Sequence, residues 1–188
     1  MNYSECIENA RTRIGNYCKA CPECNGRACK NQMPGPGAKG IGDTAIRNYD
    51  KWKEIRVQMD TIAENKPVDT SLELFGKKFL YPFFAGPVGA VGLHYGDCLD
   101  DVRYNDILVS ACAKYGIAAF TGDGLDSNVM VAATKAIGKT DGIGIPTVKP
   151  WNIDTVAEKM KMVQESKAFA VAMDVDAAGL PFLKNMEP

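Results

Sequence analysis

The sequence lacks several features that would place it quickly in a class of proteins. Its 188 residues contain no apolar run near the roughly 20 residues that cross a bilayer. The first residues also lack the apolar core of a signal peptide. The formal net charge is only −1, with acidic and basic residues well mixed. That balance argues against a nucleic acid or an anionic membrane as the partner, so we expect a cytoplasmic protein that binds neither.

Cysteine, in contrast, is concentrated in one place, because five of the seven cysteines lie in the first 29 residues. Four of them follow the spacing Cys18-x2-Cys21-x2-Cys24-x4-Cys29. This spacing is close to that of iron–sulfur ligands, although its last gap differs from the bacterial ferredoxin pattern. Four thiolates suit a structural zinc ion equally well. The sequence therefore predicts a metal site in a Cys-rich head, with an iron–sulfur cluster and zinc both left open.

Further along the chain, short apolar segments alternate with amphipathic ones. The spacing predicts a helix over 43–65, and then strands over 79–85, 117–121, 143–148 and 169–175. Helices are predicted between these strands, over 101–115, 126–138 and 152–165. One helix between each pair of strands is typical of a parallel sheet. Periodicity alone does not separate an open doubly wound sheet from half of a barrel.

Three regions follow from these patterns. Residues 1–34 form the Cys-rich head, residues 35–70 form a linker and helix, and residues 71–188 carry four strand–helix units.

A run of short motifs accompanies this pattern. Asn48, Trp52, Ile55 and Arg56 precede Asp69-Thr70-Ser71, Phe75-Gly76-x-Lys78, Pro82 and the turn Ala85-Gly86-Pro87. In these motifs the chain resembles the flavin mononucleotide (FMN)-dependent α-hydroxy-acid oxidase and dehydrogenase family. The resemblance implies an α/β fold, the N-terminal half of a (β/α)8 TIM barrel preceded by the Cys-rich head and a helix. It also implies an FMN enzyme that oxidises a small 2-hydroxy acid such as lactate or glycolate.

The resemblance further implies which residues meet the cofactor. The residues expected to bind FMN are Pro87, Val88, Gly89, Ala90, Thr121, Lys149 and Asp174. Lys149 would bring positive charge to the electron-rich edge of the flavin, and Thr121 would hydrogen-bond its pyrimidine side. Asp176 takes the catalytic position, as the carboxylate that orients the catalytic histidine and stabilises its charged form.

The sequence also departs from the family pattern. The third strand ends in Pro146, Thr147, Val148 and Lys149, where the family has a Gln and a Tyr. The catalytic His, the carboxylate-binding Arg and the phosphate loops of the family belong to the second half of its barrel. We therefore expect this chain alone to be inactive, and either to form a homo-oligomer or to require a C-terminal half.

Two alternatives to the hydroxy-acid enzyme stay open. One is another FMN barrel, of the type 2 isopentenyl diphosphate isomerase or glutamate synthase kind. The other is a non-catalytic half-barrel that needs a partner.

Overall fold

The computed structural model describes residues 2–15, 18–29, 43–124 and 126–175. The chain divides into two compact units. One contains residues 1–68 and 91–98, and the other contains residues 69–90 and 99–188. No helix among the described residues is long and apolar enough to cross a membrane.

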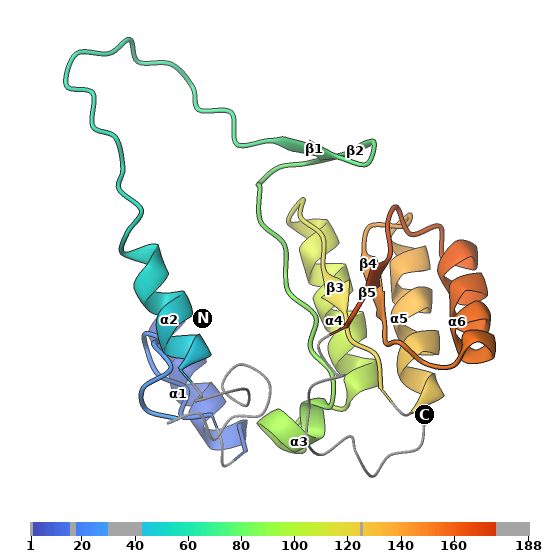
Figure 1. Cartoon of the computed structure of the whole chain (residues 1–188). Helices are drawn as coiled ribbons and strands as arrows, with labels where there is room; N and C mark the ends of the chain where they lie inside the picture. The colour runs from blue at the N-terminus through green and yellow to red at the C-terminus, as the bar shows by residue number, and fades with distance from the viewer. Residues whose placement is uncertain (1, 16–17, 30–42, 125, 176–188) are drawn as a thin grey trace. The chain divides into compact units, whose positions relative to one another are not determined.

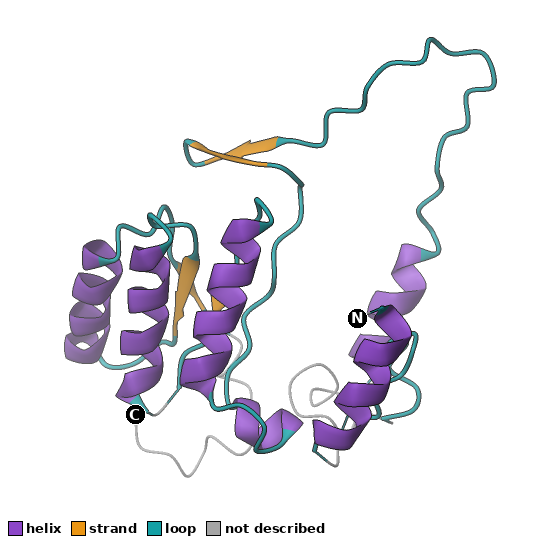
Figure 2. Ribbon diagram, turned by 180° about the vertical axis from the view of Figure 1, so that it is seen from behind, coloured by secondary structure: helices purple, strands orange, loops and turns teal. Residues whose placement is uncertain are grey.

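The larger unit is built on a parallel three-stranded sheet in the order β3-β4-β5. Its strands are β3 (Phe120–Thr121), β4 (Ile145–Val148) and β5 (Ala172–Met173). A single parallel bridge between Ala85 and Ala119 places a fourth segment beside β3. The helices α4 (Asp101–Lys114), α5 (Ser127–Lys139) and α6 (Ile153–Glu165) alternate with the strands and stand side by side (Figures 1 and 2). The predicted alternation of parallel strands and helices is therefore confirmed, although no closed barrel forms among the described residues.

The helix boundaries follow from local capping. Asp100 accepts a hydrogen bond from the backbone N–H of Arg103 at 2.7 Å, and Asp126 accepts one from that of Asn128 at 2.9 Å. Asn152 caps α6 in the same way, through the N–H of Thr155 at 3.0 Å. Each side chain satisfies a donor that the first helical turn leaves free. These starts agree with the sequence prediction to within one residue.

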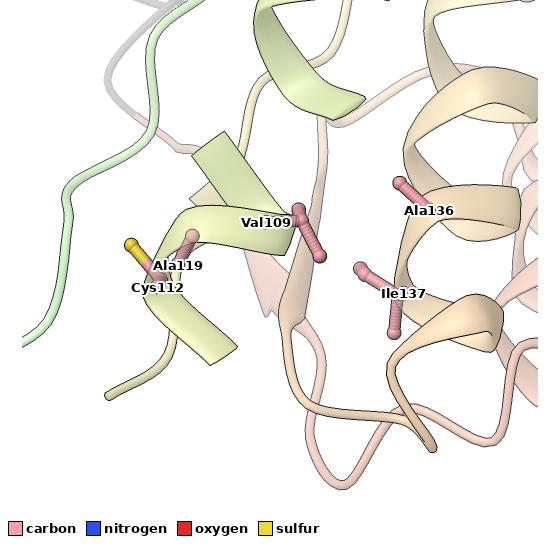
Figure 3. Packing of buried hydrophobic residues seen from close by; sticks show 5 residues of the cluster. All are labelled: Val109, Cys112, Ala119, Ala136 and Ile137. Atoms are coloured by element: carbon pink, nitrogen blue, oxygen red, sulfur yellow. The ribbon is translucent and has the colours of Figure 1, made fainter. Parts of the chain in front are cut away.

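The core lies between the helices and one face of the sheet. Val109 on α4 points toward Ala136 and Ile137 on α5, with Cys112 and Ala119 in the same cluster (Figure 3). A second cluster joins Met130, Val148 and Val163. The apolar faces of the three helices therefore pack against this face of the sheet.

The predicted strand over 79–85 is wrong in most of its length. Lys77–Phe79 instead forms β2, antiparallel to β1 (Leu72–Leu74). Phe75 and Gly76 form the turn with φ of 48° and 75°, a combination that suits a two-residue hairpin. Leu80 and Phe83 are 57% and 60% exposed, so the apolar run is not buried on both faces.

The predicted helix over 43–65 ends early. The observed helix is α2 (Thr44–Trp52), and no helix follows it in the described residues up to Val68. Ile55, Met59 and Ile62 are 65%, 87% and 98% exposed. Helical spacing of apolar residues stabilises a helix only when a packing surface receives them, and here none does.

The smaller unit holds α1 (Tyr3–Arg13), α2, α3 (Val91–Tyr95) and the cysteine-bearing loop 18–29. The Nε of Arg11 donates to the carbonyl of Ala20 at 3.3 Å, which holds this loop against α1. The N–H of Gly15 donates to the carbonyl of Tyr95 at 2.7 Å, which ties the end of α3 to the residues after α1. Few apolar side chains are buried here, so polar contacts set the arrangement of this unit.

Candidate functional site

The loops that follow the first two parallel segments meet closely. A Cβ built on Gly122 would lie 2.2 Å from the carbonyl oxygen of Val88, and one on Gly89 would lie 3.0 Å from that of Asp123. Only glycine permits this approach of two backbones. The predicted cofactor loop, residues 87–90, is therefore held against the end of β3. This is the carboxyl edge, where parallel α/β proteins place their binding residues.

Register and alternation show which side chains share the open face of the sheet, the face that α4–α6 do not cover. Thr147 pairs with Ala172, and Val148 pairs with Met173. Val148 packs in the helix-facing cluster, so Thr147 and Ala172 face the other way. Two residues further along, Lys149 and Asp174 fall on the same open face.

Lys149 and Asp174 form an ion pair there. The Nζ of Lys149 lies 3.0 Å from Oδ2 of Asp174, and each side chain is 29% exposed. The N–H of Asp174 also donates to the carbonyl of Val148 at 2.9 Å. Two of the predicted cofactor residues are thus brought together, partly accessible to a ligand.

Thr147 is a residue that the sequence analysis missed. Its Oγ1 is buried and has no hydrogen-bond partner among the described residues, and the residue is 4% exposed. Leaving a buried hydroxyl unsatisfied costs free energy, so such groups are often ones that a ligand satisfies. Stepping back two residues from Lys149 along the predicted strand would have found it.

Thr121 lies on the other face. It pairs with Pro146, which shares its face with Val148, and it follows Ala119 of the helix-facing cluster by two residues. Its Oγ1 is buried without a partner in the described part of the chain. This position does not favour contact with a ligand on the open face, and the cofactor role of Thr121 stays a prediction.

Asp123 is the most heavily bonded side chain at this edge, and the sequence analysis gave it no role. Its Oδ1 accepts from the Nζ of Lys159 at 2.5 Å and from the N–H of Gly124 at 2.8 Å. Its Oδ2 accepts from the Nε1 of Trp151 at 2.7 Å and from the N–H of Lys149 at 2.9 Å. The carboxylate therefore joins the ends of β3 and β4 to α6 and fixes the backbone from which Lys149 projects.

One signal in the sequence could have revealed this cluster. Lys159 lies three residues after Val156 and four before Val163, on the apolar stripe of its helix. A lysine on a stripe that packs against a sheet requires a buried anionic partner. Asp123, between two glycines just after β3, is a carboxylate of that kind.

Comparison with known protein families identifies the family of this chain. Residues 35–184 match the family model described as FMN-dependent dehydrogenase. The chain belongs to the FMN-dependent dehydrogenase family. No curated protein matches the chain. The family binds FMN, so the cofactor expected from the sequence is supported.

Several residues of this chain suit that cofactor. The open face offers the cationic Nζ of Lys149, whereas the unpartnered hydroxyl of Thr147 on the same face is buried. Cβ atoms built on Gly86 and Gly124, in the loops at this edge, would meet no atom within 4 Å. In the described residues, the amides of Val88, Gly89 and Ala90 donate no backbone hydrogen bond. Free donors and one cation match the polar edge of a flavin.

Two further predictions have different outcomes. Asp176 lies outside the described residues, so its catalytic role stays a prediction. The metal prediction is not confirmed, because the described residues gather no three His, Cys, Asp or Glu side chains in a metal-binding arrangement. Cys18, Cys21, Cys24 and Cys29 are all free thiols.

Proposed function

We propose that this chain forms part of an FMN-dependent enzyme that oxidises a small (S)-2-hydroxy acid to the 2-oxo acid. The observation that carries the proposal is the Lys149–Asp174 pair on the open face of the sheet, 3.0 Å apart and partly exposed. It lies in a chain that matches the FMN-dependent dehydrogenase family.

Oxidation of the substrate requires a positive charge near the cofactor, where negative charge develops. Bound FMN supplies the acceptor for the two electrons that the α-carbon of the substrate loses. Lys149 places a positive charge where negative charge develops during that transfer, and Asp174 holds the ammonium group in position. Asp123 fixes the backbone of Lys149 from the opposite face through the 2.9 Å hydrogen bond. Contacts on both sides of the sheet thus hold Lys149, so its side chain and backbone move little when a ligand binds.

The test compares variants of Lys149 in flavin binding and reduction. FMN is titrated into the purified chain and its fluorescence quenching is followed. Lys149→Met should weaken binding by about tenfold, which corresponds to the loss of about 1.4 kcal/mol. Lys149→Arg should retain most of the affinity, because it keeps the charge. Lys161→Met is the matched control, since Lys161 is an exposed lysine on α6.

Substrate class is tested by anaerobic bleaching of the flavin absorbance with a panel of small 2-hydroxy acids, in the assembly that completes the barrel, because the chain alone is expected to be inactive. The (S)-enantiomers should reduce the flavin and the (R)-enantiomers should not. Flavin that binds tightly but is reduced by none of the panel would contradict the hydroxy-acid assignment and favour another FMN barrel enzyme.

We propose that this chain pairs either with a second copy or with another chain that supplies the remaining strands. A parallel barrel of this class requires about eight strands. Among the described residues, Ala85 pairs only with Ala119, and β5 pairs only with β4. Unpaired strand edges promote association. In light scattering, a dimer whose formation FMN strengthens would favour the second copy, and a chain that binds FMN only with another chain would favour that partner. A monomer that binds FMN would contradict both.

A further inference from the structure

The cysteine-bearing loop 18–29 is the part of the molecule that FMN chemistry does not use. It contains four cysteines with gaps of two, two and four residues, and all four are free thiols. None is fully buried, so none is explained as a small apolar core residue, as Cys112 is.

All four thiols lie in one short segment, residues 18–29. The Sγ of Cys29 lies 3.5 Å from the carbonyl oxygen of Gly26, so this thiol donates back into the turn that precedes it.

The backbone around these sulfurs has features of thiolate loops. The N–H of Ala20 lies 3.5 Å from Sγ of Cys18, and an amide two residues after a cysteine stabilises negative charge on its sulfur. Ala20 and Gly26 have φ of 44° and 72°, which turn the chain after Cys18 and after Cys24. A Cβ on Gly26 would lie 2.8 Å from that of Ala45, so this turn is also fixed by close packing.

The loop is anchored at several points along its length and contains no helix or strand. Tyr3 donates from its hydroxyl to the carbonyl of Pro22 at 2.5 Å, and Arg27 pairs with Asp50 at 3.3 Å. No helix or strand runs through residues 18–29, so bringing the sulfurs together breaks no ladder of backbone hydrogen bonds. The loop is therefore constrained in position but free to close around an ion.

We propose that Cys18, Cys21, Cys24 and Cys29 together bind one metal centre through four thiolates, and that this centre orders the smaller unit. Each thiol releases one proton to the solvent on binding, and no electron is transferred. The centre is of the soft-metal class that thiolates select, a zinc ion or an iron–sulfur cluster. The described residues do not gather three of these sulfurs, so we expect the loop to rearrange when the metal binds.

The first experiment measures metal in the full chain, purified anaerobically without chelator. Elemental analysis should give about one zinc per chain, or iron with an equal amount of acid-labile sulfide. The two results distinguish the centres, and either supports the four-thiolate site. Cys24→Ser should lose most of the metal. The matched controls are Cys6→Ser and Cys98→Ser, exposed cysteines outside the spacing, which should keep it.

A second measurement avoids variants that fail to fold. Co²⁺ is added to the unaltered metal-free chain, and thiolate-to-cobalt absorption is recorded. Bands of the strength typical of four thiolates, displaced by Zn²⁺, are expected. Hydrogen exchange should slow at residues 18–29 and at Gly15 and Gly96, whose backbones meet where α3 ends. The proposal is overturned if the purified chain holds no metal and Co²⁺ gives no thiolate bands, or if Cys6→Ser loses metal as Cys24→Ser does.

Discussion

Two lysine–aspartate pairs lie at the carboxyl edge of the same sheet, and they differ in almost every physical respect. In the Lys159–Asp123 pair the side chains are 8% and 0% exposed, and in the Lys149–Asp174 pair both are 29% exposed. Asp123 accepts four hydrogen bonds, two at each oxygen. The first pair faces the helices and is closed to ligands. The second faces the open side and is accessible.

The difference separates structural from chemical roles. A buried pair with every lone pair satisfied holds its surroundings in one arrangement, whereas a half-buried pair keeps charge available to a ligand. The two are connected, because Asp123 also binds the backbone N–H of Lys149. The buried Lys159–Asp123 pair therefore fixes the end of β4, which carries Lys149 of the exposed pair.

Breaking the closed pair should have the largest effect on stability. Lys159→Met leaves the Asp123 carboxylate buried without its cation, at a cost of about 3–5 kcal/mol in the free energy of unfolding. Denaturation by urea measures the change. The double variant Asp123→Asn/Lys159→Met should lose less than the single one, because no unpaired charge remains.

The control for this prediction is Lys161→Met on the exposed face of the same helix. It should change the free energy of unfolding by less than about 0.5 kcal/mol. A single Lys159→Met variant as stable as this control would show that the closed pair does not stabilise the strand ends.

Substitution of Gly122 tests the close contact between loop 87–90 and the end of β3. In Gly122→Ala the new Cβ would meet the carbonyl of Val88 at 2.2 Å, so the two loops must separate. We expect a cost of about 1–3 kcal/mol, as for other overpacked sites, together with weaker FMN binding. Gly124→Ala is the matched control, because its Cβ would meet no atom within 4 Å. Equal behaviour of the two variants would contradict the close packing of the loops.

The sequence predicted this region unevenly, for physical reasons. Strands and helices from residue 101 onward were found because each helix has a capping residue and an apolar face that the sheet receives. The helix over 53–65 was wrong because spacing does not show whether a partner surface exists, and Ile62 is 98% exposed. The hairpin of β1 and β2 was missed because its strands have three residues each, too few for alternation to be recognised.

The candidate site could also be predicted only in part. Lys149 and Asp174 were predicted from the family resemblance, and they do form a pair. Asp123 and Lys159 are 36 residues apart in the chain, and no local pattern joins them. Thr121 and Thr147 are both threonines near strand ends, and only the register places them on opposite faces. Long-range pairing and strand register are set by tertiary packing, which a single sequence does not display.

Substitution of Thr147 tests whether its buried hydroxyl has a structural role or a role in ligand binding. Because its Oγ1 has no partner in the described part of the chain, Thr147→Val should leave the free energy of unfolding unchanged or raise it slightly. The same variant should weaken FMN binding. Thr134→Val is the control, since its buried hydroxyl donates to the carbonyl of Met130 at 2.8 Å and its loss should cost about 1 kcal/mol. A Thr147→Val variant that loses as much stability as Thr134→Val would show that the hydroxyl already has a structural role.

The smallest expected change in stability concerns Cys112. This thiol is buried in the core, whereas Cys98 is exposed. Burial raises the pKa of the Cys112 thiol, because the thiolate is poorly solvated there. The folded chain therefore holds this proton more tightly than the unfolded chain. Stability from this group is complete below the unfolded thiol pKa of about 8.5 and declines as pH rises through the higher folded pKa. Urea denaturation between neutral and alkaline pH should show this decline, and Cys112→Ala should flatten it. Alkylation should also label Cys98 well before Cys112, and equal rates would mean that α4 does not shield the thiol.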